Sequence, residues 1–416
     1  MECRKQLCEK CKKKEDDYFL VTLFFNFFKE KIHKNQVCRV KLSRPHLLLA
    51  LLLFAMSSLS AQYYIEPAVR VGRVIPNASN VGWLSNVSMY GAEIRFGKQT
   101  TGKYAWEKLF NYPEMGIAAR YGHFDSPVLG YKFALFGYLN GTIYRIRRWT
   151  FHYQFGFGIS YWSNPYNLEA NPRNRFIGSH INAHIDLALG VDCRLSGKTA
   201  LTLRANFSHS SNAALKLPNM GINPLSGAIG LKCYLQKPDS LEFNWKIRDT
   251  AFRKSNSFYV MASAGTRQSK KDAVVTNGAA GPYYIGLNLQ IGYLRQFHPK
   301  FRYGGGIDIN YSSELARQLN EGAEHKHSKY ISQAVFAAFE VMYGRLVLHV
   351  SGAVYINRAF AFNTPFYERA GMRVLLGKEM NHFVGASVKA NAGSVDFLEL
   401  HYGYRFVQFG KGWRKF

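Results

Sequence analysis

The chain has 416 residues, of which 47% are hydrophobic and 19% are charged, and its mean hydropathy is −0.20. This composition excludes an intrinsically disordered chain, and the length is enough for one large domain or two ordinary ones. The formal net charge of +27 favours anionic partners such as phosphorylated lipid or nucleic acid, and it does not choose between them.

A targeting signal is predicted near the N-terminus. Residues 39–62, RVKLSRPHLLLALLLFAMSSLSAQ, have a basic head, an apolar stretch and a small-residue end, which is typical of a secretory signal peptide. The apolar stretch is too short to span a bilayer as a helix, and we expect cleavage after Ala61, so that 39–61 is the signal peptide. Export signals normally begin close to the N-terminus, and the extension at 1–38 is therefore consistent with a mis-started translation.

Beyond Ala61 the hydrophobic pattern has a period of two, which predicts β-strands. In HINAHIDLALGV (180–191) one face is apolar and the other is polar or small, as in a strand of about ten residues that crosses a bilayer. The high aromatic content of 15% and the 36 glycines are also typical of membrane β-barrels. The pattern predicts strands at about 63–75, 86–99, 115–125, 131–145, 149–162, 179–195, 199–211 and 226–235. It predicts a second set at about 258–268, 283–297, 301–313, 331–344, 345–357, 366–377, 382–393 and 395–406.

The strand count and the connections favour an antiparallel transmembrane β-barrel, because open sheet edges cannot face lipid. Short turns at 145–149 and 194–199 alternate with longer loops at 163–176 and 212–225, which lie outside the cell if the chain enters the membrane from the periplasm.

Two β-rich halves, 62–235 and 258–416, are joined by a polar linker at 236–257. Residues 199–235 and 382–406 are similar in spacing and pattern, which indicates a duplication. The periodicity leaves open whether the halves form two eight-stranded barrels or one barrel of roughly sixteen strands.

Two clusters that could be taken for metal sites are better explained otherwise. Cys8 and Cys11 have the spacing of half a zinc site, but no second pair follows at a suitable distance. His180, His184 and Asp186 are spread along one strand over about 20 Å, and we expect them to be polar packing inside a barrel. The sequence therefore predicts no metal site.

The predicted strand at 199–211 carries the candidate catalytic site. Leu203, Phe207, His209 and Ser211 share one face, whereas Arg204 lies on the other. An arginine facing lipid would be costly, so the leucine face must point to lipid, and His209 and Ser211 lie near its outer end. Alternate residues on a strand are about 7 Å apart, and a local bend would allow the imidazole to take the serine proton for attack on an ester. The alternative is that His209 and Ser211 are polar residues at the membrane–water interface, where the apolar band of the barrel ends.

HSSNAALKLPNMGIN (209–223) resembles the active-site segment of the lipid A 3-O-deacylase (PagL) family of outer-membrane esterases, in particular the longer acyloxyacyl-hydrolase-type members of Bacteroidetes-like bacteria. NRFIGSHINAHIDLALGVDCRLS (174–196) is similar to the hairpin that precedes this segment. The resemblance is clear over about 149–235, extends in outline over 63–235 and is loose in the second half.

The resemblance implies an esterase in the outer membrane of a Gram-negative bacterium, inserted by the barrel-assembly machinery. Its substrate would be a hydroxyacyl ester of lipid A in lipopolysaccharide, and neither a cofactor nor a nucleic-acid partner is implied. Residue by residue, it makes His209 the general base and Ser211 the nucleophile. Asn212 and the backbone at Ala213 and Ala214 would help to form the oxyanion hole.

The third catalytic position departs from the family pattern. The family has a glutamate fourteen residues after the histidine, and this sequence has Asn223 there. An amide oxygen can accept the imidazole N–H but has no charge to stabilise an imidazolium. Asp125 or Glu169 could take the place of the missing acid. The alternative is a non-catalytic barrel, either a scaffold that binds lipopolysaccharide or a pore.

Overall fold

The computed structural model describes residues 62–76, 79–238, 252–269, 281–314, 330–357 and 364–409. The predicted extension, the predicted signal peptide and residues 239–251 of the predicted linker lie outside these ranges. Within them, no helix is long and apolar enough to cross a membrane.

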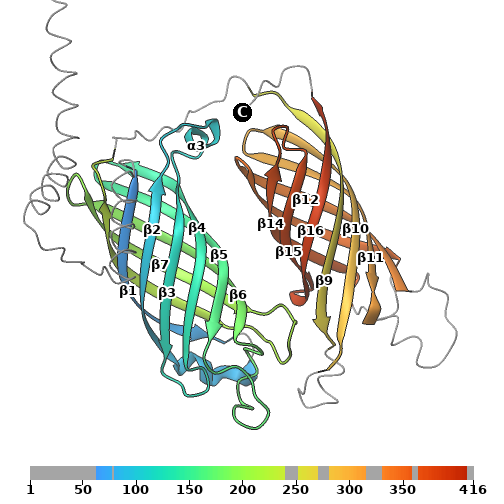
Figure 1. The fold of residues 1–416 in the computed structure, drawn as a ribbon, viewed down its shortest axis with the longest axis horizontal. Helices are drawn as coiled ribbons and strands as arrows, with labels where there is room; N and C mark the ends of the chain where they lie inside the picture. The colour runs from blue at the N-terminus through green and yellow to red at the C-terminus, as the bar shows by residue number, and fades with distance from the viewer. Residues whose placement is uncertain are drawn as a thin grey trace, which may run out of the picture. The chain divides into compact units, whose positions relative to one another are not determined.

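Each half of the chain forms its own closed antiparallel barrel of eight strands (Figure 1). The prediction of an all-β barrel fold is confirmed, and of the two arrangements left open the structure has two small barrels. The first barrel consists of β1 (Tyr63–Ile75), β2 (Ser88–Gln99), β3 (Glu114–Phe124), β4 (Tyr131–Ile146), β5 (Trp149–Trp162), β6 (Ile181–Arg194), β7 (Thr199–Ser211) and β8 (Asn223–Tyr234). The second consists of β9 (Ser255–Gln268), β10 (Tyr283–His298), β11 (Phe301–Ser312), β12 (Ile331–Tyr343), β13 (Leu346–Asn357), β14 (Phe366–Leu376), β15 (His382–Asn391) and β16 (Ser394–Phe409).

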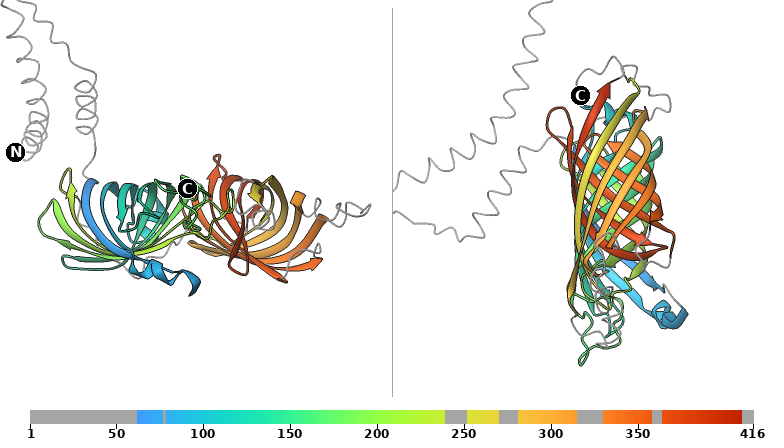
Figure 2. Two further views of the ribbon diagram at one scale, coloured as in Figure 1. Left: turned by 90° about the horizontal axis from the view of Figure 1, so that it is seen from below. Right: turned by 90° about the vertical axis from the view of Figure 1, so that its right-hand side faces the viewer.

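Neighbouring strands pair in chain order, and each barrel closes between its first and last strand, β1 with β8 and β9 with β16. The strands of each barrel are tilted, which is clear for the second barrel in the right-hand view of Figure 2. The first barrel also has two short helices in its connections, the 3₁₀-helix η1 (Ser79–Asn86) and α3 (Ala105–Leu109).

The outer wall of the first barrel is apolar and its interior is charged. Val69 and Val71 are exposed on the outside of β1, whereas Arg70 between them is buried. Arg70 contacts the carboxylate of Glu93 at 3.3 Å, and Arg120 joins Asp186 at 2.6 Å. An eight-stranded barrel is just wide enough for side chains to fill it, so these ion pairs occupy the interior.

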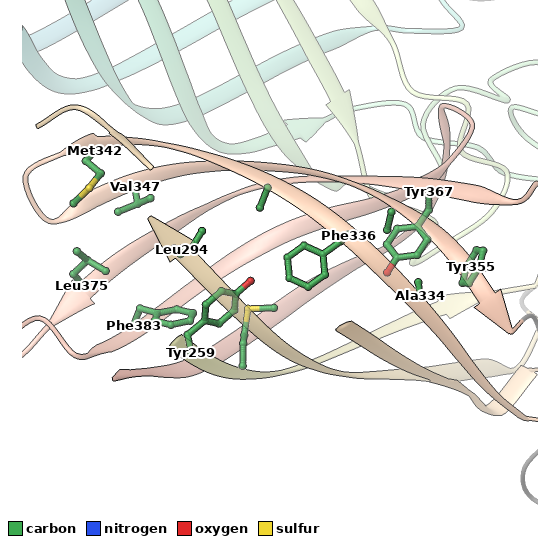
Figure 3. Close-up of a cluster of buried hydrophobic side chains, with 13 residues drawn as sticks. Tyr259, Leu294, Ala334, Phe336, Met342, Val347, Tyr355, Tyr367, Leu375 and Phe383 are labelled. Carbon is green, nitrogen blue, oxygen red and sulfur yellow. The ribbon is translucent and has the colours of Figure 1, made fainter. Parts of the chain in front are cut away.

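The interior of the second barrel contains both ion pairs and a cluster of buried hydrophobic side chains, drawn in Figure 3. Tyr259 and Phe383 belong to this cluster, with ring centroids 6.0 Å apart. Arg369 is fully enclosed and contacts Glu399 at 2.7 Å and Asp308 at 2.8 Å. Side chains therefore fill this barrel as well.

One end of the first barrel is covered by a hydrophobic cluster. Its members come from the ends of β1, β3 and β5, from η1 and from the neighbouring loops, and include Val74, Leu84, Phe124, Trp162, Phe176 and Ile222. Strand β7 ends at the same end of the barrel, because odd-numbered strands of an antiparallel barrel run in one direction. The candidate site therefore lies beside packed loops.

Candidate active site

Strand β7 alternates between an exposed face and a buried face up to His209. Leu203 is 44% exposed and Phe207 37%, whereas Arg204 between them is 4% exposed. His209 comes next on the exposed side and is half-buried. Ser211 follows it but is only 7% exposed, because the loop after β7 covers it. Alternation along the strand alone would have left this hydroxyl open.

The pairing of β7 with β8 brings His209 and Asn223 together. Phe207 pairs with Leu225, and Ser210 forms an isolated bridge with Ile222, both in one register that puts Asn223 directly across from His209. The regular ladder stops short of this pair because Pro224 has no backbone N–H to donate. His209 Nδ1 lies 2.7 Å from Asn223 Oδ1. The spacing of fourteen residues is thus a cross-strand contact.

This contact fixes the tautomer of the imidazole. An amide oxygen can only accept, so His209 Nδ1 carries the proton and donates it to Asn223 Oδ1. The lone pair of the imidazole then lies on Nε2, the nitrogen available to a reacting group. Gly221 has a φ of +73°, and a Cβ there would lie 2.5 Å from His209 Cε1. Only glycine lets the loop approach the ring so closely.

Two N–H donors converge on the hydroxyl of Ser211. Asn219 Nδ2 donates to Ser211 Oγ at 2.7 Å, and the backbone N–H of Ala213 donates to it at 3.1 Å. Asn219 Oδ1 also accepts from the backbone N–H of Asn212 at 3.2 Å. Between His209 and Ser211, both in the described ranges, the structure has no hydrogen bond. No role was predicted for Asn219, although it lies in the segment 209–223 between Asn212 and Asn223.

The three residues that the resemblance assigned to an oxyanion hole form a tight turn. Ala213 and Ala214 have φ values of +52° and +66°, a left-handed conformation that costs alanine about 1–2 kcal/mol per residue. This turn points the Ala213 N–H at Ser211, and the Ala214 N–H donates to no acceptor in the described part of the chain. The Asn212 side chain is occupied elsewhere, because its Nδ2 donates to Ser179 Oγ at 2.9 Å and to the backbone oxygen of Lys216 at 2.8 Å.

Neither candidate replacement acid bonds to His209 in the described part of the chain. Asp125 and Glu169 are both exposed. Among the residues that the structure describes, neither carboxylate forms a hydrogen bond or ion pair with His209, whose partner is Asn223.

His180, His184 and Asp186 were predicted to be polar packing inside a barrel, and two of the three are. His184 and Asp186 are buried inside the barrel, where Asp186 holds Arg120. The prediction is wrong for His180, which precedes β6, is exposed and stacks on Tyr161 with ring centroids 5.3 Å apart. In the described ranges, no group of three or more His, Cys, Asp or Glu side chains could hold a metal ion.

The equivalent hairpin of the second barrel has no room for such a site. β15 and β16 are its seventh and eighth strands, as β7 and β8 are in the first barrel. They are joined by Ala392 and Gly393, whose φ values of +50° and +77° are those of a two-residue hairpin turn. The long loop that covers Ser211 is therefore a property of the first barrel.

A closed antiparallel barrel with an apolar wall and a charged interior defines the protein as an outer-membrane β-barrel protein. Residues 90–232 match the family model for lipid A 3-O-deacylase (PagL), and residues 256–408 match the model for the acyloxyacyl hydrolase C-terminal domain. Together the two models cover most of the chain, which belongs to the PagL family of outer-membrane enzymes. The family and the outer-membrane location predicted from the sequence are thereby confirmed.

Solved structures add distant similarities. The crystal structure of the outer membrane enzyme PagL is 18% identical over 40% of this chain and 97% of that chain, with a TM-score of 0.28. The outer membrane protein Omp33 of Acinetobacter baumannii is 8% identical over 84% of this chain and 100% of its own, with a TM-score of 0.16. A triple mutant of the Rhodopseudomonas blastica porin is 6% identical over 83% of this chain and 99% of its own, also with a TM-score of 0.16. No curated protein sequence matches the chain.

Proposed function

We propose that the first barrel is a lipid A deacylase that hydrolyses a hydroxyacyl ester of lipopolysaccharide with Ser211 and His209, at the level of the outer leaflet. The observation that carries this proposal is the hydrogen bond of 2.7 Å from His209 Nδ1 to Asn223 Oδ1, next to a serine hydroxyl contacted by two N–H donors. It leaves Nε2 of the imidazole as the base in a segment that the PagL family model covers.

In the proposed reaction, Ser211 Oγ attacks the ester carbonyl while His209 Nε2 takes its proton. The C–O bond to the sugar then breaks, and the sugar hydroxyl leaves with the proton from His209. Water hydrolyses the acyl-serine in the second half of the cycle, with His209 again taking and returning a proton. Catalytic hydrogen bonds often shorten only when substrate binds, so this cycle is compatible with a histidine and a serine that are not yet bonded.

The oxyanion that forms in this reaction needs N–H donors. We assign the Asn219 side chain and the backbone N–H groups of Ala213 and Ala214 to this role, because two of them already contact Ser211 Oγ and the third has no acceptor among the described residues. Asn212, whose amide braces the loop, is a positioning residue.

An apolar groove on the outer wall could hold the acyl chain. It measures about 580 Å³ and its lining includes Val71, Tyr90, Ala205, Leu225 and Gly227. Ala205 pairs with Gly227 in the register that also pairs Phe207 with Leu225, so the groove begins next to His209 and Asn223 on the same wall. An acyl chain in this groove would present its ester to the site from the side.

The groove gives a prediction with a matched control. A Cβ at Gly227 would meet nothing within 4 Å, so leucine at this position fills the groove without a clash. Gly227→Leu is expected to lower kcat/KM for a long acyl chain about tenfold, because about 1–2 kcal/mol of apolar contact is lost. Gly352→Leu is the control, since Gly352 in β13 is equally unobstructed. Equal kcat/KM for both variants and the unchanged protein would exclude the groove as the acyl site.

The proposed function is tested by mass spectrometry of lipid A from cells that express the protein and from cells that lack it. We expect expression to remove the mass of one hydroxyacyl group. An unchanged acylation pattern with a correctly inserted barrel would favour a second candidate, a non-catalytic scaffold that binds lipopolysaccharide. The observation that supports this candidate is the uncharged Asn223 at the position of the family's glutamate.

A further inference from the structure

A second cavity opens among the loops at the same end of the first barrel. It measures about 830 Å³, within the size range of small-molecule sites. Its wall comes from the β3–β4 loop, the β5–β6 loop and Lys216 of the β7–β8 loop. We call it the loop pocket; its lining includes Val128, Asn164, Arg173, Ser179, His180 and Lys216.

Hydrogen bonds between these loops shape the loop pocket. Asn171 Nδ2 donates to the backbone oxygen of Val128 at 3.0 Å, and Asn174 Nδ2 donates to the same oxygen at 3.2 Å. The backbone N–H of Met220 donates to Arg175 O at 3.1 Å, which ties the β7–β8 loop to the β5–β6 loop. The loop pocket is therefore formed before a ligand arrives.

The charge of the loop pocket is positive. Arg173 and Lys216 line it together with His180, and the lining includes no Asp or Glu. Arg173 lies 5.7 Å from the centre of the Trp83 ring, and neither its guanidinium nor the Lys216 ammonium forms an ion pair with a described residue. Glu169, in the same loop as Arg173, is exposed and does not line the pocket. Arg173 and Lys216 are both exposed at the pocket, and two cations without an ion-pair partner among the described residues favour an anionic ligand.

The loop pocket is joined directly to the candidate site. Asn212, which follows Ser211, donates from Nδ2 both to Ser179 Oγ at 2.9 Å and to Lys216 O at 2.8 Å. Ser179 and Lys216 are both lining residues. A ligand in the loop pocket would therefore lie next to the loop that positions the nucleophile.

We propose that the loop pocket binds the phosphorylated sugar headgroup of the lipid substrate, with Arg173 and Lys216 as contacts to phosphate. This inference rests on the proposed function, because it assigns the headgroup to the loops while the acyl chain lies on the barrel wall. Polar lining groups such as the Asn164 and Ser179 side chains are suited to sugar hydroxyls. Arginine and lysine are the usual partners of a phosphate group.

The test measures binding, so that it does not depend on turnover. The full chain in detergent is titrated with lipid A and with dephosphorylated lipid A, and every sample carries Ser211→Ala so that the lipid is not hydrolysed. The otherwise unchanged protein is compared with a variant that also carries Arg173→Ala and Lys216→Ala. We expect the double variant to bind lipid A at least about tenfold more weakly, and to bind the dephosphorylated lipid as the unchanged protein does. Lys198→Ala, in the exposed turn between β6 and β7 at the opposite barrel end, is the matched control.

Three results would overturn the proposal. The double variant could bind lipid A as tightly as the Lys198→Ala control, or the unchanged protein could fail to prefer the phosphorylated lipid. Displacement of lipid A by inorganic phosphate alone would indicate a site for free phosphate instead of a lipid headgroup. A protein that binds lipid A through Arg173 and Lys216 but releases no fatty acid would refute the proposed deacylase and leave the loop pocket in place.

Discussion

Replacing Ser211 with alanine is expected to lower kcat for lipid A deacylation by at least about 10³-fold, because the attacking oxygen is removed. KM should change little, since the groove and the loop pocket, which would hold the acyl chain and the headgroup, keep their lining. The measurement is the rate of fatty acid release from lipid A by the purified protein. A variant that still forms product at the original rate would show that Ser211 is not the nucleophile.

Ser210→Ala is the matched control for this experiment. Ser210 is the neighbour of Ser211 in β7, and its side chain is fully buried inside the barrel, 3.2 Å from Ser160 Oγ. The Ser210→Ala variant also loses one serine hydroxyl, but on the opposite face of the same strand. We therefore expect its rate of deacylation to be within about threefold of that of the unchanged protein. Because Ser211→Ala leaves the Asn219 and Ala213 donors without an acceptor, folding of both variants is checked by the electrophoretic shift between unheated and boiled samples.

The strands were predictable because the bilayer and the filled interior impose opposite chemistry on successive residues. β7 was expected at 199–211 and is Thr199–Ser211, since Leu203 and Phe207 face outward and Arg204 faces inward. The short helices η1 and α3 were not predicted, as neither lies in a periodic segment. The number of barrels was not predictable either, because closure depends on pairing between distant strands such as β1 with β8.

At the candidate site, the identity of single residues was easier to predict from the sequence than the loop and the hydrogen bonds around them. The family resemblance implied that Asn223, fourteen residues after His209, is the partner of the imidazole, and the register of β7 with β8 explains the contact. Nothing in the period of a strand indicates how a loop folds back, so the enclosure of Ser211 and the bond from Asn219 were missed. Loop folding depends on non-local contacts such as that between Asn212 and Ser179.

The filled interiors argue against the pore alternative. In the first barrel Glu93 lies between Arg70 and Arg120, and in the second Arg369 lies between Asp308 and Glu399. Opening a water path would separate these buried charges, each of which would cost several kcal/mol without its partner.

Asn223→Asp is expected to raise kcat for deacylation about tenfold. The substitution keeps the number of heavy atoms and replaces the amide oxygen 2.7 Å from His209 Nδ1 with a carboxylate oxygen. A hydrogen bond to a charged group is stronger than a neutral one by about 1–2 kcal/mol, and the carboxylate stabilises the imidazolium that forms as His209 takes the Ser211 proton. Loss of the acid costs about 10⁴ in a serine protease, where the wrong tautomer adds to the loss. Here Asn223 already holds the correct tautomer, so the expected gain is smaller.

A series of substitutions at position 223 separates the effect of a carboxylate charge from the effect of the His209 tautomer. Asn223→Ala removes the acceptor for Nδ1–H and should lower kcat about tenfold or more, because Nε2 no longer carries the lone pair in every molecule. Asn223→Glu restores the residue expected from the family resemblance, and it should match aspartate only if the longer side chain fits across from His209 in the same register. Equal rates for alanine and asparagine would show that the 2.7 Å contact does not orient the base. A rate for aspartate at or below that of asparagine, in a folded barrel, would mean that no imidazolium forms in the rate-limiting step and that another group takes the serine proton.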